Sequence, residues 1–188
     1  MKFSMKKVTV LLADGFEEIE ALTVVDLLRR AKVYVDTVSI TDDYTVRGAH
    51  GIPVQTEDLI TEIDFKESDM IVLPGGMPGT TNLKEDENVR KAVQEAYDDG
   101  RYVAAICAAP TILADMGLLK GKRATCYPGM ESEIEDAYLT GAPVATDENI
   151  ITSQGVGTAI DFALFSFMHP LLSYQYINPA RNSTSPFL

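Results

Sequence analysis

Short apolar runs alternate along the chain with longer segments of helical periodicity, and polar or glycine-rich stretches separate them. Apolar runs of about four to eight residues, bounded by turn residues, are typical of strands buried inside a sheet. The pattern predicts strands at residues 8–13, 33–40, 69–73, 101–106, 123–126, 144–146 and 150–152. It predicts helices at residues 16–31, 85–99, 108–116 and 157–172. This order indicates an α/β fold with a mostly parallel central sheet.

The chain of 188 residues fits a single domain, because one hydrophobic core can fill a protein of this size. Residues 44–57 contain glycines and a proline between short β-prone pieces, which predicts a small hairpin or edge excursion. Residues 173–188 are polar and contain proline, so we expect them to drape over the core of residues 6–172 or to fray from it.

The first predicted helix carries both apolar and acidic residues near its start. Its apolar positions are expected to face the sheet; they are Ile19, Leu22, Val25, Leu27 and Leu28. Glu17 and Glu18 fit the role of capping charges, which the helix dipole stabilises. Glu20 lies beside the apolar face, so its carboxyl can point inwards, remain protonated and donate a hydrogen bond to a thiolate.

Charge and cysteine content limit the partners and the compartment. The net charge of -12, from 16 basic and 28 acidic residues, repels nucleic acid and anionic lipid. The apolar runs are far shorter than the roughly 20 residues that span a bilayer, and the start lacks a signal-peptide pattern. We therefore expect a cytoplasmic protein without nucleic-acid or membrane partners. Two cysteines without metal-binding spacing predict free thiols, with no metal and no cofactor.

Cys107 follows a predicted strand and precedes a predicted helix, as a nucleophile at a sharp turn does. Such a turn needs small residues two positions before and after the nucleophile, and Ala105 and Ala109 satisfy this requirement. The helix start should favour the thiolate and make Cys107 more acidic than a free cysteine. The spacing fits equally well a small, inert, buried cysteine.

A glycine loop favours the interpretation of Cys107 as a nucleophile over that of an inert cysteine. Gly75 and Gly76 follow another buried strand, and ligands of open α/β sheets bind at the carboxyl ends of the strands. An amide from this pair, together with the Ala108 amide, can form an oxyanion hole opposite Cys107.

Four further residues could take part in the chemistry of the site, but the sequence does not show where they lie relative to Cys107. His169 precedes a proline near the end of the last helix and fits a helix C-terminal cation. His50 is either a surface residue or reaches a neighbouring site, and neither histidine forms an evident pair with a cysteine. Cys126 is either a buried thiol or, close to the nucleophile, a resolving thiol. Tyr127 is a candidate hydroxyl donor to the pocket.

Four motifs in the same order resemble the ThiJ/PfpI superfamily, most of all the branch of the Parkinson-linked deglycase and bacterial ThiJ-like proteins. They are residues 13–20 (ADGFEEIE), 73–76 (LPGG), 104–110 (AAICAAP) and 152–158 (TSQGVGT), within a resemblance covering about residues 7–172. The resemblance implies a flavodoxin-like three-layer sandwich, a homodimer, Cys107 as reactive thiol, Glu20 as its carboxyl partner, and amide donors from Gly76 and Ala108.

The family's activities leave more than one function open. Members are credited with cofactor-free conversion of α-oxoaldehydes such as methylglyoxal, with removal of early glycation adducts, and with oxidative-stress sensing or chaperone activity through cysteine oxidation. A peptidase or hydrolase role is the weaker reading, because the peptidase branch has histidine where this chain has Ala108. The Parkinson-linked branch has histidine at the position of Tyr127, and Arg47 or His50 can partly replace its basic pocket residue.

Overall fold

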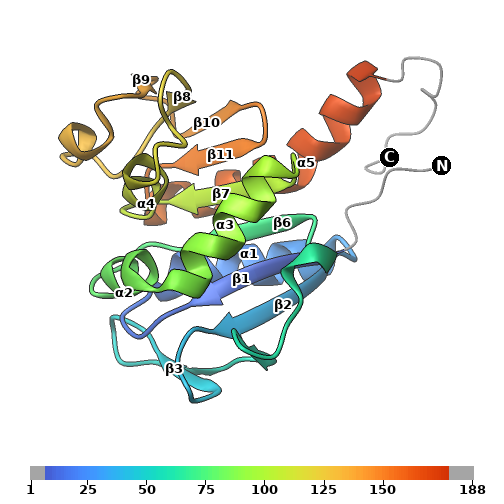
Figure 1. Cartoon of the computed structure of the whole chain (residues 1–188), viewed down its shortest axis with the longest axis vertical. Helices are drawn as coiled ribbons and strands as arrows, with labels where there is room; N and C mark the ends of the chain where they lie inside the picture. Colours follow the sequence, from blue (N-terminus) through green and yellow to red (C-terminus); the bar gives the residue numbers. More distant parts are fainter. Residues whose placement is uncertain (1–6, 178–188) are drawn as a thin grey trace.

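The computed structural model describes the chain from residue 7 to residue 177, with side chains as far as residue 169. A seven-stranded sheet in the order β10-β11-β7-β6-β1-β2-β5 runs through its centre (Figure 1). Neighbouring strands pair in parallel except β10 and β11. The strands are β1 (Lys7–Leu12), β2 (Tyr34–Ser39), β5 (Asp58–Leu59), β6 (Met70–Leu73), β7 (Tyr102–Ile106), β10 (Val144–Asp147) and β11 (Ile150–Ser153). The predicted α/β fold with a mostly parallel sheet is confirmed.

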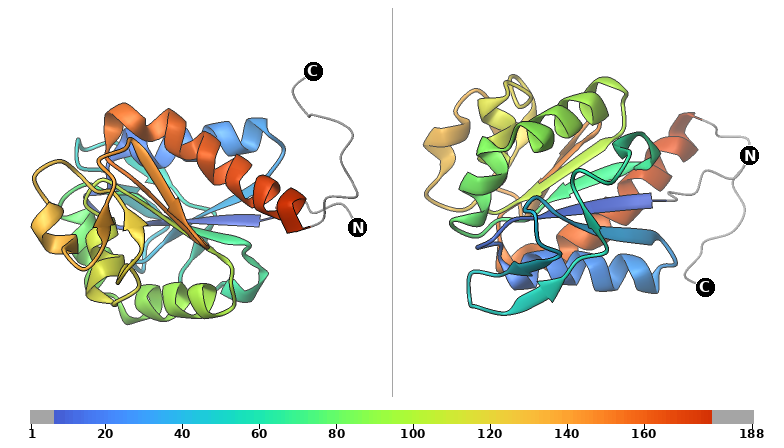
Figure 2. Two further views of the ribbon diagram at one scale, coloured as in Figure 1. Left: turned by 90° about the horizontal axis from the view of Figure 1, so that it is seen from above. Right: turned by 60° about the horizontal axis from the view of Figure 1, so that its bottom comes forward.

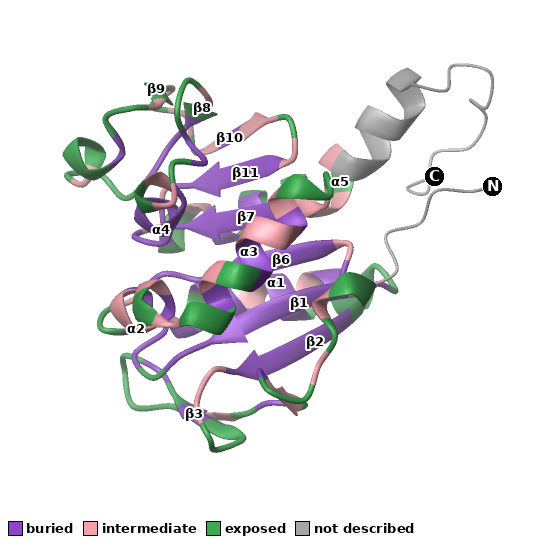
Figure 3. Cartoon of the chain, in the orientation of Figure 1, coloured by how far each residue is buried: buried purple, intermediate pink, exposed green. Residues whose placement is uncertain are grey.

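Helices cover both faces of the sheet and give three layers (Figure 2). One face carries α1 (Glu18–Arg30) and α5 (Ala159–Ile177). The other carries α2 (Gly79–Glu85), α3 (Glu87–Asp98) and α4 (Pro110–Asp115). Successive side chains of a strand point to opposite faces, so Val10 of β1 packs in the core under α1, and Leu11 in the core under α3. The strands are buried nearly throughout, whereas the outer helix faces are exposed (Figure 3).

Small elements complete the fold around this sandwich. The hairpin predicted within residues 44–57 is confirmed, since β3 (Thr45–Arg47) pairs antiparallel with β4 (Pro53–Gln55). A second pair of short strands, β8 (Arg123–Ala124) and β9 (Tyr138–Leu139), lies outside the main sheet. Three 3₁₀ turns are η1 (Phe65–Glu67), η2 (Glu131–Ile134) and η3 (Val156–Thr158).

Three predicted helices have different limits. The helix expected at 85–99 is α3, which begins at Glu87 because the Asp86 carboxylate caps it by accepting from the amides of Asn88 and Val89. Helix α2, which ends just before Asp86, was not predicted. The helix expected from Ala108 begins only at Pro110, so the turn after Cys107 is not yet helical. Helix α5 continues to residue 177, which makes the first part of the expected tail helical; residues 178–188 lie outside the described chain.

Helix α1 presents a different face to the sheet than its apolar pattern predicts. Ala21, Val24, Val25 and Leu28 are buried, but Ile19 and Leu22 are 51% and 36% exposed. Glu18 and Glu20 are buried in their place, because both carboxylates accept hydrogen bonds from other segments. The inward position foreseen for Glu20 is therefore found, while the inward positions of Ile19 and Leu22 were wrong.

Among the helices of the described residues, none is both long and apolar enough to span a bilayer.

Candidate active site

Cys107 occupies a sharp turn between β7 and α4. Its φ of 66° lies in the left-handed region, which costs a residue other than glycine about 1–3 kcal/mol. Two backbone hydrogen bonds hold this conformation: the Cys107 amide donates to the Ser153 carbonyl at 2.9 Å, and its carbonyl accepts from the Tyr127 amide at 2.8 Å. Ala105 and Ala109 are fully buried, in accord with the small residues that the turn requires.

The glycine loop after β6 approaches this turn so closely that side chains are excluded. A Cβ on Gly75 would lie 2.5 Å from Cβ of Cys107 and 2.7 Å from Oε2 of Glu20. A Cβ on Gly76, whose φ is 92°, would lie 2.3 Å from the Glu17 amide nitrogen. Both positions therefore need glycine, and the loop is brought against the start of α1 and the thiol together.

Glu20 is the buried carboxyl of the site, with 1% of its surface exposed. Its Oε2 accepts a 2.9 Å hydrogen bond from the Gly75 amide, and the carboxyl also hydrogen-bonds the Cys107 thiol. Its Oε1 is buried and has no hydrogen-bond partner within the described chain. Burial raises the pKa of Glu20 to about 7, against the two hydrogen bonds that lower it, and the charge of Glu17 adds to the rise.

The pKa of the Cys107 thiol is raised in these surroundings, whereas the sequence predicts that it is lowered. Burial, then the charge and hydrogen bond of Glu20, raise the pKa of Cys107 to about 12, although the Ala108 and Gly76 amides lower it. The predicted acidic thiol was wrong because the thiol is buried, because the Glu20 carboxyl faces the sulfur, and because α4 begins three residues later. When Glu20 takes up a proton, its charge no longer opposes the thiolate. The Ala108 and Gly76 amides hydrogen-bond the sulfur.

Gly155 and Tyr127 bound the site beside Glu20. A Cβ on Gly155 would lie 3.4 Å from Cδ2 of Tyr127 and 3.7 Å from Oε1 of Glu20. Tyr127 is 50% exposed, whereas Glu20 is buried. Sequence reasoning assigned no role to Gly155; the available signal was a glycine two residues after the carboxyl end of β11.

His50 lies next to the site but is held by other carboxylates. Its Nδ1 is 2.8 Å from Oε2 of Glu18 and 3.7 Å from Oε2 of Glu17, and its amide donates to Oε1 of Glu18 at 2.8 Å. The hydrogen bond to Glu18, with the charges of Glu17 and Glu18, raises the pKa of His50. The imidazole therefore ties the β3–β4 hairpin to the start of α1. The Arg47 guanidinium donates within the same hairpin, to the Gly51 carbonyl.

The same three side chains are the group within the described residues that could hold a metal ion. One ligand atom from each of Glu17, Glu18 and His50 lies within 4.8 Å of the others. Two carboxylates and an imidazole suit a divalent cation in principle. In the arrangement seen, Nδ1 of the His50 ring lies 2.8 Å from Oε2 of Glu18 and 3.7 Å from Oε2 of Glu17.

Cys126 lies one residue before Tyr127, whose amide donates to the Cys107 carbonyl, but the two cysteine side chains pack in different cores, and His169 lies elsewhere. Cys126 packs in the core under α4, whereas Cys107 contacts the core on the opposite face of the sheet. His169 stacks edge-on against Tyr102, with ring centroids 5.9 Å apart. Tyr102 begins the strand that Cys107 follows, so at about 3.3 Å per residue His169 lies near the other end of the sheet. Its predicted place at a helix end was wrong, because α5 continues beyond it.

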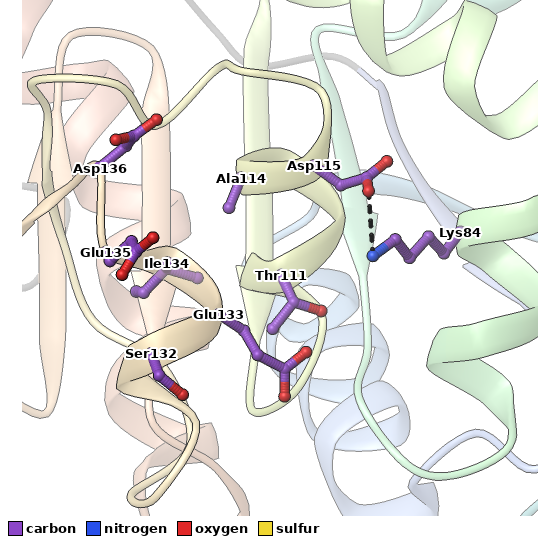
Figure 4. A pocket seen from close by; sticks show the side chains of 9 residues that line it. All are labelled: Lys84, Thr111, Ala114, Asp115, Ser132, Glu133, Ile134, Glu135 and Asp136. Atoms are coloured by element: carbon purple, nitrogen blue, oxygen red, sulfur yellow. Dashed lines mark ion pairs between the residues drawn. The ribbon is translucent and has the colours of Figure 1, made fainter.

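A separate cavity of about 320 Å³ lies between α2, α4 and η2 (Figure 4). Four of its nine lining residues are acidic; the lining consists of Lys84, Thr111, Ala114, Asp115, Ser132, Glu133, Ile134, Glu135 and Asp136. The one lysine in this lining is paired with Asp115 at 3.1 Å (Figure 4). No predicted site residue lines the cavity, so the chemistry of the chain is better sought at Cys107.

Residues 6–167 match the model of the DJ-1/PfpI family. The chain belongs to this family. It is 35% identical to protein dj-1beta of Drosophila melanogaster over 161 residues, covering 85% of this chain and 86% of the relative. It is 33% identical over 171 residues to a Schizosaccharomyces pombe protein named glutathione-independent glyoxalase DJ-1, covering 85% and 88%. Against DJ-1 homolog B of Arabidopsis thaliana, 39% identical, it spans only 38% of the relative's length.

Solved structures of the family share the fold. A DJ-1 superfamily protein of Salmonella typhimurium superposes with a TM-score of 0.84 at 32% identity, covering 95% of this chain and all of the other. Oxidized DJ-1 of Toxoplasma gondii gives 0.82 at 32% identity, with 93% and 96% covered. The resemblance stated from four sequence motifs is thereby confirmed.

Proposed function

We propose that this DJ-1/PfpI protein is a cofactor-free, glutathione-independent enzyme that converts α-oxoaldehydes such as methylglyoxal to hydroxy acids. The observation that carries the proposal is a buried carboxyl with a pKa of about 7 and one free oxygen, in contact with a thiol that two backbone amides face. A general acid and base works best when its pKa lies near the working pH. The name of the S. pombe relative supports the same activity.

In the first step, Glu20 accepts the thiol proton and the Cys107 sulfur adds to the aldehyde carbon. The oxygen of that carbon becomes an oxyanion beside the Gly76 and Ala108 amides, and it is then protonated by Glu20. The Glu20 carboxylate removes the hydrogen of the former aldehyde carbon as a proton and returns a proton to the neighbouring carbon, while the hydroxyl proton on the former aldehyde carbon passes to the oxygen of that neighbour and leaves a thioester carbonyl behind. The resulting thioester is hydrolysed by water, which releases lactate from methylglyoxal and restores the thiol.

The two oxygens of Glu20 have different roles in this scheme. Oε2 is held by the Gly75 amide at 2.9 Å, which fixes the orientation of the carboxyl. Oε1 is without a partner in the described chain and is therefore the oxygen available to carry protons between the two substrate carbons. Holding one oxygen and leaving the other free combines positioning with proton transfer.

The test is lactate formation from methylglyoxal by purified protein without glutathione. Cys107→Ala and Glu20→Gln should each lower turnover by at least about 100-fold, the usual contribution of a nucleophile or general base. Cys126→Ala is the matched control, since it removes the thiol that packs in the other core, and it should keep wild-type turnover. Unchanged turnover in both site variants would contradict the proposal.

A second candidate is a peroxide sensor, or a chaperone regulated by oxidation, that uses the same cysteine without turnover. Two equivalents of peroxide convert a thiolate to a sulfinate and release two molecules of water. The amides of Gly76 and Ala108 and a protonated Glu20 would stabilise that anion, and a related structure is of an oxidized protein. Intact-mass analysis after mild peroxide decides: selective addition of two oxygens at Cys107, with negligible aldehyde turnover, favours the sensor.

We also propose that the protein is a homodimer. Helices α1 and α5 lie side by side on one face of the sheet (Figure 2). They expose large apolar side chains, namely Ile19, Leu22, Ile160, Leu164, Phe165 and Met168. Large exposed apolar side chains on two neighbouring helices favour association. Sedimentation equilibrium should give a dimer mass, and a monomer mass at micromolar concentration would contradict it.

A further inference from the structure

Three hydrogen bonds join the Cys107 turn, the end of β11 and the segment after β8 into a closed circuit. The Cys107 amide donates to the Ser153 carbonyl at 2.9 Å, and the Tyr127 amide donates to the Cys107 carbonyl at 2.8 Å. The Thr125 amide donates to Oγ1 of Thr152 at 3.0 Å. Thr152 directly precedes Ser153 in β11, and segment 125–127 carries both of the other donors, so short stretches of main chain close the circuit. The third bond is the one that depends on a side chain.

Thr152 is a fully buried hydroxyl in an otherwise apolar part of its strand. The two residues before it, Ile150 and Ile151, pack in the cores on opposite faces of the sheet. Burying a hydroxyl costs free energy unless it finds a hydrogen-bond partner, and the Thr125 amide is such a partner. Thr125 is itself 3% exposed, so its amide has this oxygen in place of water. The hydroxyl at position 152 therefore does something that a valine of the same shape could not do.

The Cys107 turn needs support because its backbone is strained. A φ of 66° is unfavourable for a residue other than glycine, and such a conformation persists where the surroundings hold it. Segment 125–127 supplies one of the two main-chain bonds to Cys107, yet it lies outside the central sheet, because β8 ends at Ala124 and pairs with β9 (Figure 1). The bond from Thr125 to Thr152 attaches this segment directly to a central strand.

The position of the sulfur decides how well its neighbours can act on it. The Ala108 and Gly76 amides hydrogen-bond the sulfur, and the Glu20 carboxyl also hydrogen-bonds the thiol. Hydrogen bonds weaken steeply as their distance and angle depart from the optimum. A backbone shift at Cys107 would thus weaken all three contacts at once, with no change in the groups that make them.

We propose that Thr152 is a positioning residue for the Cys107 nucleophile. Its hydroxyl holds the Thr125 amide, and thereby the segment whose Tyr127 amide fixes the Cys107 carbonyl. The inference rests on the proposed function where it concerns turnover, but it applies equally to the reaction of the thiol with any electrophile. The hydroxyl at position 152, rather than the shape of the side chain, then controls the reactivity of Cys107.

The experiment compares two pairs of side chains at position 152 that differ by the hydroxyl. One pair is the wild type and Thr152→Val, and the other is Thr152→Ser and Thr152→Ala. Timed labelling with iodoacetamide at neutral pH, followed by peptide mapping, measures the rate at Cys107, and lactate formation measures kcat for methylglyoxal. Both should fall by about 10-fold or more in the variants without the hydroxyl, because misplaced reacting groups lose rate on this scale. Thr152→Ser should stay within about 2-fold of wild type.

Thr9→Val is the matched control, because it also removes a fully buried hydroxyl from a central strand. Oγ1 of Thr9 shares a 2.6 Å hydrogen bond with Oγ of Ser68, which precedes β6 and so lies at the end of that strand opposite to the glycine loop. This variant should keep the labelling rate of Cys107. Cys126 is an internal reference in every variant: a general loss of stability raises the labelling of both thiols, whereas loss of positioning lowers the rate at Cys107 and does not lower that at Cys126.

Equal rates at Cys107 with and without the hydroxyl overturn the inference, and so does an equal fall in Thr9→Val. If the wild type forms no lactate but the labelling rates follow the hydroxyl, the proposed function fails and the positioning role stands. If lactate forms and the labelling rates do not follow the hydroxyl, the positioning role fails and the proposed function stands. Circular dichroism shows which variants are folded, and the pair of Thr152→Ser and Thr152→Ala decides should Thr152→Val not fold.

Discussion

The two cysteines are joined through one backbone hydrogen bond between their segments, yet they differ in nearly everything that decides reactivity. Cys107 is partly exposed, and its sulfur faces two amides and the carboxyl of Glu20. Cys126 is buried to 3% exposure, and Sγ has the Tyr127 carbonyl at 3.6 Å. The pKa of both thiols is raised, to about 12 and about 11, primarily by burial. A raised pKa alone therefore does not separate an inert thiol from a nucleophile; a nearby proton acceptor does.

The strongest test of this comparison is the relative rate at which the two thiols react. In native protein at neutral pH, iodoacetamide should label Cys107 about 100-fold faster than Cys126, the contribution of a positioned base. Peptide mass mapping of timed samples measures both rates. In urea the two rates should converge, since neither set of neighbours survives unfolding. Equal rates in the native protein would refute the distinction.

The next largest expected effect is the contribution of Glu20 to the pH dependence of protein stability. Its pKa rises from 4.5 unfolded to about 7 folded, so the folded state binds more protons between these values and stability falls as pH rises through that window. A shift of this size corresponds to about 3 kcal/mol. The Glu20→Gln variant has no carboxyl to titrate and so does not lose this stability. The difference in free energy of unfolding, variant minus wild type, should therefore rise by up to about 3 kcal/mol from pH 4 to pH 8.

Urea unfolding at several pH values measures the difference. Contributions from His50 and Glu18 have their own pH dependence, but they are present in both proteins and cancel in the comparison. Parallel stability curves for wild type and Glu20→Gln would show that Glu20 has an ordinary pKa in the folded protein.

The smallest expected effect concerns the glycine loop that brings the site together. Gly75→Ala places a methyl group 2.5 Å from Cβ of Cys107, and should lower the free energy of unfolding by about 1–3 kcal/mol and distort the thiol site. Gly157→Ala is the matched control, because a Cβ there meets no atom within 4 Å. Thermal melting compares the two, and equal losses would show that the close approach at Gly75 is unimportant.

Much of the fold followed from local patterns, because buried strands and turn residues leave signals within a few positions. The sheet, the turn at Cys107 and the glycine loop are of this kind. The face of α1 did not follow, since Glu20 is buried through a hydrogen bond to Gly75, 55 residues away. The side of the sheet on which Cys126 packs could not be predicted either. Side chains alternate between the two faces along a strand, but β8 has only two residues and ends before Cys126. The raised pKa of Cys107 did not follow from the sequence either, because it depends in part on Glu20, which the hydrogen bond from Gly75 holds in place.

Because the amide and carbonyl of Cys107 are bound to Ser153 and Tyr127, the end of β11 and the loop after β8 hold the reactive residue by its main chain. A shift of this strand end, or a change in the length of that loop, would move the sulfur relative to Gly76 and Glu20 while every side chain that meets the substrate stayed the same. Reactivity in this fold can thus be adjusted by mutations remote from the substrate, and loop lengths around the turn are as informative about chemistry as the nucleophile itself.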